Sequence, residues 1–379
     1  MRQFYQKYVM PHLPFLICTI LLCVLIAIPT GYEDAVIYQG TDRCKAEVLE
    51  TDESTVIDSG LIRSGEQTCI VKLLGGRFKG QETEAYNLLS GSLESDKIFA
   101  VGDTAQVVIS YQGDEILSVN MIDHYRLDKE LILMAIFSVV LIIFARGIGL
   151  RSLLSFVISV LGIWKILVPC CLNGANPIVV GLGVVTVLTC VIISLVYGYD
   201  RRFLSATSGV LLGVLTTCIL GIIFTNTFKI HGAVMAYSES LLYAGFEHLN
   251  LTQIFMASIF IGASGAIMDI AVDITSAVNE VVEKKPDIGV KEAILSGIHV
   301  GRAAMGTMTT TLLLAYSGGF MALLMVFMAQ GTPIYNILNY KYVSSEILHT
   351  IVGSFGLVAV APFTALMSGL LLTHKKIRE

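Results

Sequence analysis

Long apolar segments follow one another almost without interruption from Leu131 to Leu372, and they constrain the fold more than any other feature. Only 15% of the 379 residues are charged, whereas soluble globular chains carry about 25%. So few charges cannot cover the surface of a water-soluble protein of this length. The sequence therefore predicts an integral membrane protein and excludes a soluble enzyme.

A spanning helix needs about 20 mostly apolar residues, and it satisfies all its own backbone N–H and C=O groups, for which lipid offers no partners. The apolar runs are too long and alternate too little for strands of a membrane barrel. We therefore expect an α-helical polytopic membrane protein with about eight transmembrane helices. The expected spans are residues 11–29, 129–146, 151–171, 177–198, 203–225, 250–274, 304–329 and 346–372.

Lysine and arginine residues set the expected orientation, because short cytoplasmic loops carry an excess of them. Eight spans place both termini on one side, and the short segments of that side hold thirteen Lys and Arg residues. The opposite short loops hold only Lys229 and Lys341. We therefore expect both termini in the cytoplasm and an uncleaved first span.

A polar stretch separates the first expected span from the other seven. It contains alternating, β-branched segments at 44–50, 67–74 and 105–111, bounded by turn-forming residues, and these predict half-buried strands. The sequence thus predicts an N-terminal transmembrane anchor (1–30), a small extracytoplasmic β-rich domain of OB-like size (31–128) and a seven-span helical domain (129–379).

The outer domain shows no Ser/His/Asp constellation, no phosphate-binding glycine loop and no cluster of metal ligands. Its expected role is to pack or to recruit a protein partner. Cys44 and Cys69 both fall on predicted strands in an oxidising compartment, where they could form a disulfide or remain two buried thiols. No CxxC pair occurs among the eight cysteines, so neither a metal nor another cofactor is expected.

Two carboxylates, Asp269 and Asp273, stand in the sixth expected span. An ionisable group inside a bilayer costs about 2.5–3.5 kcal/mol and is usually kept for a function or a pairing. The spacing of four residues places both carboxylates on one helix face, where they could carry a proton or hold a cation. The alternative is that Asp273 already lies in the cytoplasmic headgroup zone and is simply solvated.

The seventh expected span carries a second polar set. Thr307, Thr310 and Thr311 share one helical face, and Arg302 precedes them by just over one turn. Because the loop between the two spans is short, we expect them to be antiparallel neighbours. Arg302 would then face one of the two aspartates, or else anchor at the cytoplasmic interface.

Glycines accompany both polar sets. In membrane helices they allow close approach of a neighbouring backbone, and a glycine pair near mid-membrane could break the helix. The residues expected to pack or break these helices are Gly262, Gly265, Gly301, Gly306, Gly318 and Gly319. The bland alternative is a packing seam of small residues without a pathway.

Gly262–Asp269 (GASGAIMD) and Gly301–Tyr316 (GRAAMGTMTTTLLLAY) resemble, in this order and spacing, the signature segments of the YibE/F-like bacterial membrane proteins. The layout of one span, an outer domain and seven spans is also similar. The resemblance implies a multi-pass protein of the bacterial plasma membrane and favours a permease. The family pattern usually has an acidic residue in place of Ala303, an asparagine in place of Thr310 and a small residue in place of Asp273. Asp273 could therefore replace the carboxylate missing at position 303.

Two functions follow from these observations. The first is a permease for a small ion or solute, with a pathway lined by Asp269, Asp273, Arg302, Thr307, Thr310 and Thr311. The second is a non-transporting scaffold whose outer domain recruits a partner, or whose polar seam packs helices or a second copy. We do not expect an enzyme, because no HExxH pattern and no intramembrane Ser–His pair occurs. The net charge of −5, without a basic tract, argues against nucleic acid.

Overall fold

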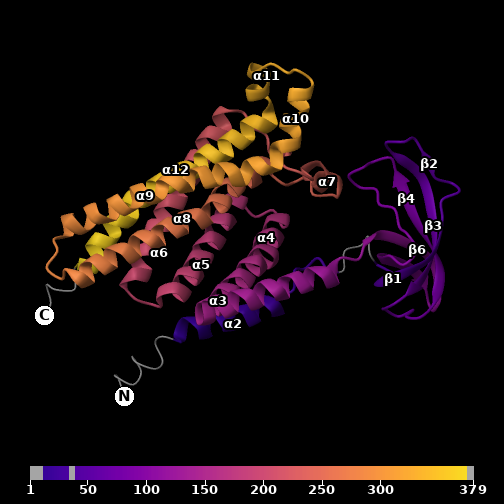
Figure 1. The fold of residues 1–379 in the computed structure, drawn as a ribbon, viewed down its shortest axis with the longest axis horizontal. Helices are drawn as coiled ribbons and strands as arrows, with labels where there is room; N and C mark the ends of the chain where they lie inside the picture. Colours follow the sequence, from indigo (N-terminus) through magenta and orange to yellow (C-terminus); the bar gives the residue numbers. More distant parts are fainter. Residues whose placement is uncertain (1–11, 34–38, 374–379) are drawn as a thin grey trace. The chain divides into compact units, whose positions relative to one another are not determined.

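The computed structural model describes residues 12–33 and 39–373, and the chain divides into two compact units (Figure 1). Gly31–Phe144 forms the first, called the barrel unit, and Met1–Thr30 joins Ala145–Glu379 in the second, called the helical unit. The expected positions of the chain ends, including Arg2, Lys7 and the basic residues after Thr373, lie outside the described residues.

The barrel unit contains six strands whose order is β1-β5-β6-β4-β3-β2, with a further pairing of β1 to β3 that closes five of them into a small barrel. Every pair is antiparallel except β4–β6, which is parallel at Tyr86 and Asn120. The three segments predicted as strands lie in β1, β3 and β5. The strand bounds are β1 Thr41–Asp52, β2 Ile57–Asp58, β3 Arg63–Leu73, β4 Glu82–Ser90, β5 Thr104–Gln112 and β6 Glu115–His124.

Alternation along the strands builds the barrel core. In β5, Ala105, Val107 and Ile109 are fully buried while the residues between them are partly exposed, as the two-residue period of a strand requires. One polar side chain, Gln67, is also fully buried. Its Nε2 donates to the Phe99 carbonyl (2.8 Å), and its Oε1 accepts from the Phe99 N–H (3.0 Å) and from Asn87 Nδ2 (3.0 Å). The amide is therefore satisfied, as a buried polar group must be.

The rest of the chain is helical. Its elements are α2 Leu13–Ala27, α3 Leu127–Gly162, the π-helical turn η3 Ile163–Leu167, α4 Val168–Leu172, α5 Pro177–Tyr197, α6 Arg201–Thr227, the 3-10 turn η4 Gly232–Val234, α7 Ser238–Tyr243, α8 Leu251–Lys284, α9 Val290–Ser317, the 3-10 turn η5 Gly318–Phe320, α10 Met321–Ala329, α11 Ile334–Asn339 and α12 Lys341–Thr373.

Six of the described helical segments are long and apolar enough to cross a membrane, and α2 is a shorter apolar helix. The longest segment, Leu127–Leu172, contains both expected spans 129–146 and 151–171. Its helix is interrupted at Arg146, where φ is 49° and ψ is −124°. The helices α8 and α9 extend well beyond the expected spans because polar turns continue each helix past its apolar run. The count of eight crossings and their sidedness stay predictions.

Polar side chains form hydrogen bonds with backbone groups at the ends of several helices. Asn176, Asp200 and Asn250 accept backbone N–H groups at the first turns of α5, α6 and α8, which otherwise lack partners. At the opposite ends, arginines donate to free carbonyls: Arg151 to Leu195 O and Arg201 to Leu371 O, both at 3.3 Å. These contacts place the end of α5, the start of α6 and the end of α12 at one end of the helical unit.

The core of the helical unit surrounds α8, which packs against α5, α6, α9 and α12 (Figure 1). Ile267, Ile270 and Ile274 of α8 are fully buried in it. On α6, Gly209 allows close contact with α12, since a Cβ there would lie 2.9 Å from the Thr364 Cα. Small residues at such contacts let membrane helices approach closely.

Candidate functional site

One face of α8 is left uncovered by the surrounding helices, and it carries the two aspartates. Gly265, Asp269, Asp273 and Ser276 recur at three- and four-residue spacing and are all exposed, while most residues on the other faces are buried. We call these four residues the α8 stripe. The predicted placement of Asp269 and Asp273 on one helix face follows from the unbroken α-helix.

The cytoplasmic end of the stripe, as predicted from the sequence, meets a tyrosine of α5. The hydroxyl group of Tyr197 donates to the Val272 carbonyl (2.7 Å) and lies 2.6 Å from the Ser276 Oγ. Arg202, at the start of α6, stacks its guanidinium over the same ring at 5.1 Å. The Tyr197 hydroxyl group and the Arg202 guanidinium thus lie at the Ser276 end of the stripe.

The structure pairs α8 with α9 but does not pair Arg302 with an aspartate. A Cβ at Gly301 would lie 3.0 Å from Ile274 Cδ1 and 2.9 Å from Ala361 Cβ, so Gly301 and Ile274 fill the contact between the helices. Arg302 therefore lies at the depth of Asp273, as expected. Because successive helical residues point about 100° apart, both side chains turn away from the contact. Both are exposed, and no ion pair joins them.

The three threonines of α9 are likewise exposed. Thr307 donates to Ala304 O at 3.2 Å, and Thr311 donates to Thr307 O at 3.1 Å, so these two hydroxyl groups are held against their own helix. Arg302 and Thr307 are five residues apart, which corresponds to about 140° around an α-helix. Thr311 lies about 180° and Thr310 about 80° from Arg302 by the same geometry, so Arg302 shares a side of α9 with Thr310 but not with Thr307 or Thr311.

The glycines fall into two groups. Gly262 and Gly301 lie in close contacts, whereas Gly265, Gly306, Gly318 and Gly319 have nothing within 4 Å of an added Cβ. The last two belong to η5, the single 3-10 turn between α9 and α10. Only the first group therefore packs helices within this chain.

A polar cluster that the sequence analysis did not single out lies beside Gly262. Tyr316 of α9 stacks on His349 of α12 with ring centroids 4.6 Å apart and planes inclined by 28°. Glu346 precedes His349 by three residues and therefore shares its face of α12. Tyr316 OH, Glu346 Oε1 and His349 Nε2 are buried and make no hydrogen bond within the described structure. The signal in the sequence was Glu-x-x-His at the start of the last span.

Cys44 and Cys69 carry free thiols and are not brought together. Cys69 on β3 lies opposite Thr51 of β1, whereas Cys44 lies seven residues earlier on β1, opposite Val107. At about 3.3 Å per residue, seven residues of a strand span more than 20 Å, far beyond disulfide reach. Burial raises the pKa of the Cys69 thiol to about 11, so it stays protonated at neutral pH.

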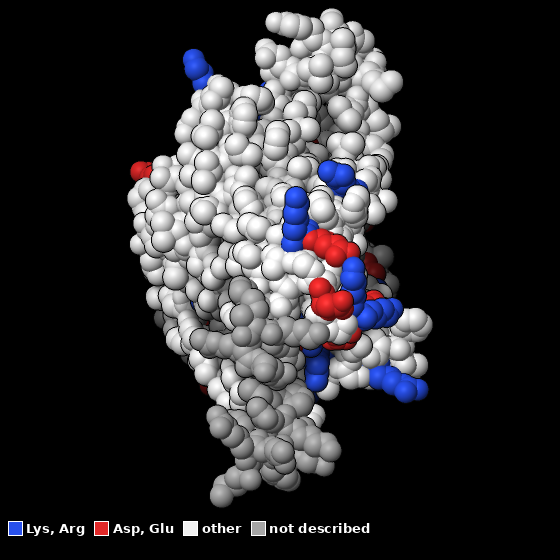
Figure 2. All heavy atoms as spheres, turned by 90° about the vertical axis from the view of Figure 1, so that its left-hand side faces the viewer, with Lys and Arg blue, Asp and Glu red and all other residues white. Residues whose placement is uncertain are grey.

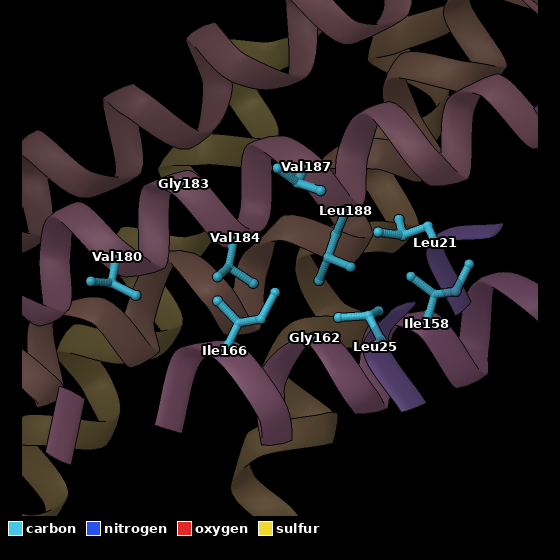
Figure 3. A pocket seen from close by; sticks show the side chains of 10 residues that line it. All are labelled: Leu21, Leu25, Ile158, Gly162, Ile166, Val180, Gly183, Val184, Val187 and Leu188. Atoms are coloured by element: carbon cyan, nitrogen blue, oxygen red, sulfur yellow. The ribbon is translucent and has the colours of Figure 1, made fainter. Parts of the chain in front are cut away.

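An apolar pocket of about 270 Å³ lies between α2, the second half of α3, η3 and α5 (Figure 3). Its side chains are aliphatic throughout. The lining residues are Leu21, Leu25, Ile158, Gly162, Ile166, Val180, Gly183, Val184, Val187 and Leu188. No side chain in this wall donates or accepts a hydrogen bond, so the pocket does not suit an ion.

The sequence model of the YibE/F-like protein family matches residues 133–374, which is well over half of the chain. The chain belongs to the YibE/F-like family. No curated protein and no solved structure matches it. The resemblance noted in the sequence is thereby confirmed.

The residues matched by the YibE/F-like model include the polar candidate sites of the helical unit. The α8 stripe, the α9 threonines and the cluster of Tyr316, Glu346 and His349 all lie inside the matched residues, whereas α2 and the barrel strands lie outside them. The matched residues therefore include the helices that carry the candidate sites.

Proposed function

We propose that this YibE/F-like protein is a permease of the bacterial plasma membrane and that a small cation or protonatable solute passes along the α8 stripe. The observation that carries the proposal is the position of Asp269 and Asp273, on the uncovered face of the most buried helix. Carboxylates facing lipid would each cost about 2.5–3.5 kcal/mol. A water-filled path beside the stripe removes that cost, and two adjacent carboxylates favour a cationic passenger.

The charged side chains at one end of the helical unit support the orientation that we propose, with both termini in the cytoplasm. Figure 2 views the end of the helical unit at which the α8–α9 turn lies, and charged side chains gather there within a largely uncharged surface. Ion pairs of Glu280 with Lys284 and of Lys285 with Glu292 belong to this end. Basic residues near the ends of spans favour the cytoplasmic side.

The test is flux into liposomes that contain the purified full chain, with a panel of monovalent and divalent cations, small organic cations and a pH-sensitive dye. Asp269→Asn should abolish the flux of whichever cation the wild type carries. Glu280→Gln is the matched control, because Glu280 follows Asp273 by two turns on the same helix but is paired with Lys284. Equal flux in wild type and Asp269→Asn would refute the pathway.

A scaffold is the second candidate, since a second copy covering the α8 stripe would also shield its carboxylates. The barrel unit favours the scaffold, because it lies outside the residues that the family model matches. The closed order of its five strands, with one parallel pair, is also the order of an OB-type barrel, so we propose that it recruits a partner. Gly265→Cys distinguishes the candidates: cross-linking between copies through this position would favour the scaffold, whereas reaction with a water-soluble thiol reagent would favour the path.

A further inference from the structure

Three buried polar atoms without a hydrogen-bond partner lie on α9 and α12, in the part of the helical unit where these two helices pack with α8. They are Tyr316 OH, Glu346 Oε1 and His349 Nε2, each buried and without a hydrogen bond among the described residues. Native proteins satisfy nearly all buried polar groups, so each exception calls for an explanation. Three exceptions from two helices at one place indicate a site rather than three separate accidents.

Gly262 of α8 lies beside two of these atoms, Tyr316 OH and His349 Nε2. The position that a Cβ would occupy at Gly262 lies 2.7 Å from Tyr316 OH and 3.2 Å from His349 Nε2. Both atoms therefore converge on the same point of the α8 backbone. An added methyl carbon at Gly262 would therefore push against both side chains.

The surroundings leave few other ionisable groups. The ring of His349 meets the Ser258 backbone and the Phe255 ring from α8, neither of which ionises, and Tyr316 from α9. An apolar cluster that includes Phe255 lies beside the His349 ring; its members are Ile230, Phe255, Ile259, Leu348, Val352, Leu220, Phe224, Val234 and Met235. On α12 itself the nearest ionisable neighbours are Glu346 and, one turn earlier, Tyr342. Glu346 also acts electrostatically on the Tyr316 hydroxyl group.

Charge and size together select the ligand. An ionised Glu346 would leave one uncompensated negative charge in the interior, which is costly. Within residues 12–33 and 39–373, no three His, Cys, Asp or Glu side chains form a group that could hold a metal ion. A proton fits: it neutralises the cluster, needs no space, and finds a carboxylate and an imidazole one helical turn apart.

We propose that Glu346, His349 and Tyr316 form a buried proton-binding site, in which the carboxylate and the imidazole together take up a single proton from water. That proton forms one O–H or N–H bond and leaves the cluster without net charge. A second proton is disfavoured because it would create an uncompensated buried cation. The site is a property of the folded chain and does not depend on the proposed permease function.

The experiment uses the full chain in lipid nanodiscs, with ¹⁵N-labelled histidine and with His349→Gln to assign the His349 signals. Infrared difference spectra with Glu346→Gln assign the carboxyl band. Between about pH 5 and pH 9, where an imidazole ordinarily titrates, one of the two groups should change protonation. Replacing the other group should shift that midpoint by about one pH unit, a tenfold change in proton affinity. Tyr316→Phe should shift the midpoint less, since it removes a hydroxyl group and no charge.

The proposal is overturned if neither group titrates in this range, or if each midpoint is the same with and without its partner. Should Glu346→Gln fail to fold, Gly262→Ala provides the second measurement, since its methyl group displaces both Tyr316 OH and His349 Nε2. Gly265→Ala is the matched control on the same helix, because nothing lies within 4 Å of its Cβ. Equal midpoints in these two alanine variants would also overturn the proposal.

Discussion

Replacing Gly209 by alanine tests a close contact between α6 and α12. The added Cβ would lie 2.9 Å from the Thr364 Cα and in direct collision with the Thr364 Oγ1. Carbon atoms prefer separations of about 3.5–4.0 Å, so α6 and α12 must move apart along an interface that also contains Gly213 and Val360. Overpacking of this kind costs about 1–3 kcal/mol, against which the better helix propensity of alanine returns up to about 1 kcal/mol.

The matched control is Gly221→Ala on the same helix. There the nearest atom to the added Cβ is Ile259 Cδ1 at 3.7 Å, an ordinary contact. This variant should therefore gain up to about 1 kcal/mol of stability. Because both variants share that gain, they should differ by the overpacking cost alone, about 1–3 kcal/mol.

Thermal unfolding in detergent, followed with a dye that fluoresces on reaction with thiols, measures the difference. Cys218 of α6 is only 4% exposed and becomes reactive when α6 separates from its neighbours. Gly209→Ala should unfold at a clearly lower temperature than wild type, and Gly221→Ala at the same or a higher one. If both variants unfold together, α6 and α12 do not pack at Gly209 as described.

Three further predictions concern the barrel unit. Alkylation of the denatured protein without reductant should modify both Cys44 and Cys69, and a disulfide-linked peptide found by mass spectrometry would contradict the strand register. Gln67→Leu should lower the stability of the barrel unit by about 2–4 kcal/mol, because it removes the partner of the Phe99 N–H and C=O and one of the two acceptors of Asn87 Nδ2. Hydrogen exchange in β3 and β4 should rise; unchanged exchange would argue against the buried amide network. Backbone N–H groups, chiefly that of Ser90, lower the pKa of Asp96, so its contribution to stability is complete above the usual aspartate range and is lost as pH falls through the lowered value. Asp96→Asn should therefore reduce the acid sensitivity of the 90–96 turn, measured by proteolysis as pH falls, and the same sensitivity in both proteins would refute this assignment.

The amino-acid sequence predicted the membrane class, the helical segments and a small β domain because these depend on apolar run length and alternation. Those patterns are local and survive in any tertiary context. The closure of the barrel through β1 and β3 and the central place of α8 could not be predicted in this way. They depend on contacts between residues far apart in the chain, such as Gly209 with Thr364.

The candidate site was predictable in part for the same reason. Helical spacing alone places Asp269 and Asp273 on one face, but whether neighbours cover that face depends on how five helices pack. The expected pairing of Arg302 with an aspartate was wrong because both side chains point away from the contact between α8 and α9. Gly301 and Ile274 fill that contact instead. The cluster at His349 was missed because its third member, Tyr316, comes from another helix.

The contacts of α12 bear on how the protein is made. This helix comes last among the described elements, and it packs against α6, α8 and α9, where Ala361 and Ala365 fill the spaces beside Gly301 and Gly297. Chains are synthesised from the N-terminus, and their early parts begin to fold first. The earlier helices must therefore wait in the bilayer as an open bundle, with the small-residue faces of α6 and α9 unfilled, until α12 has left the ribosome and inserted. Maturation of the core is thus tied to the synthesis and insertion of α12.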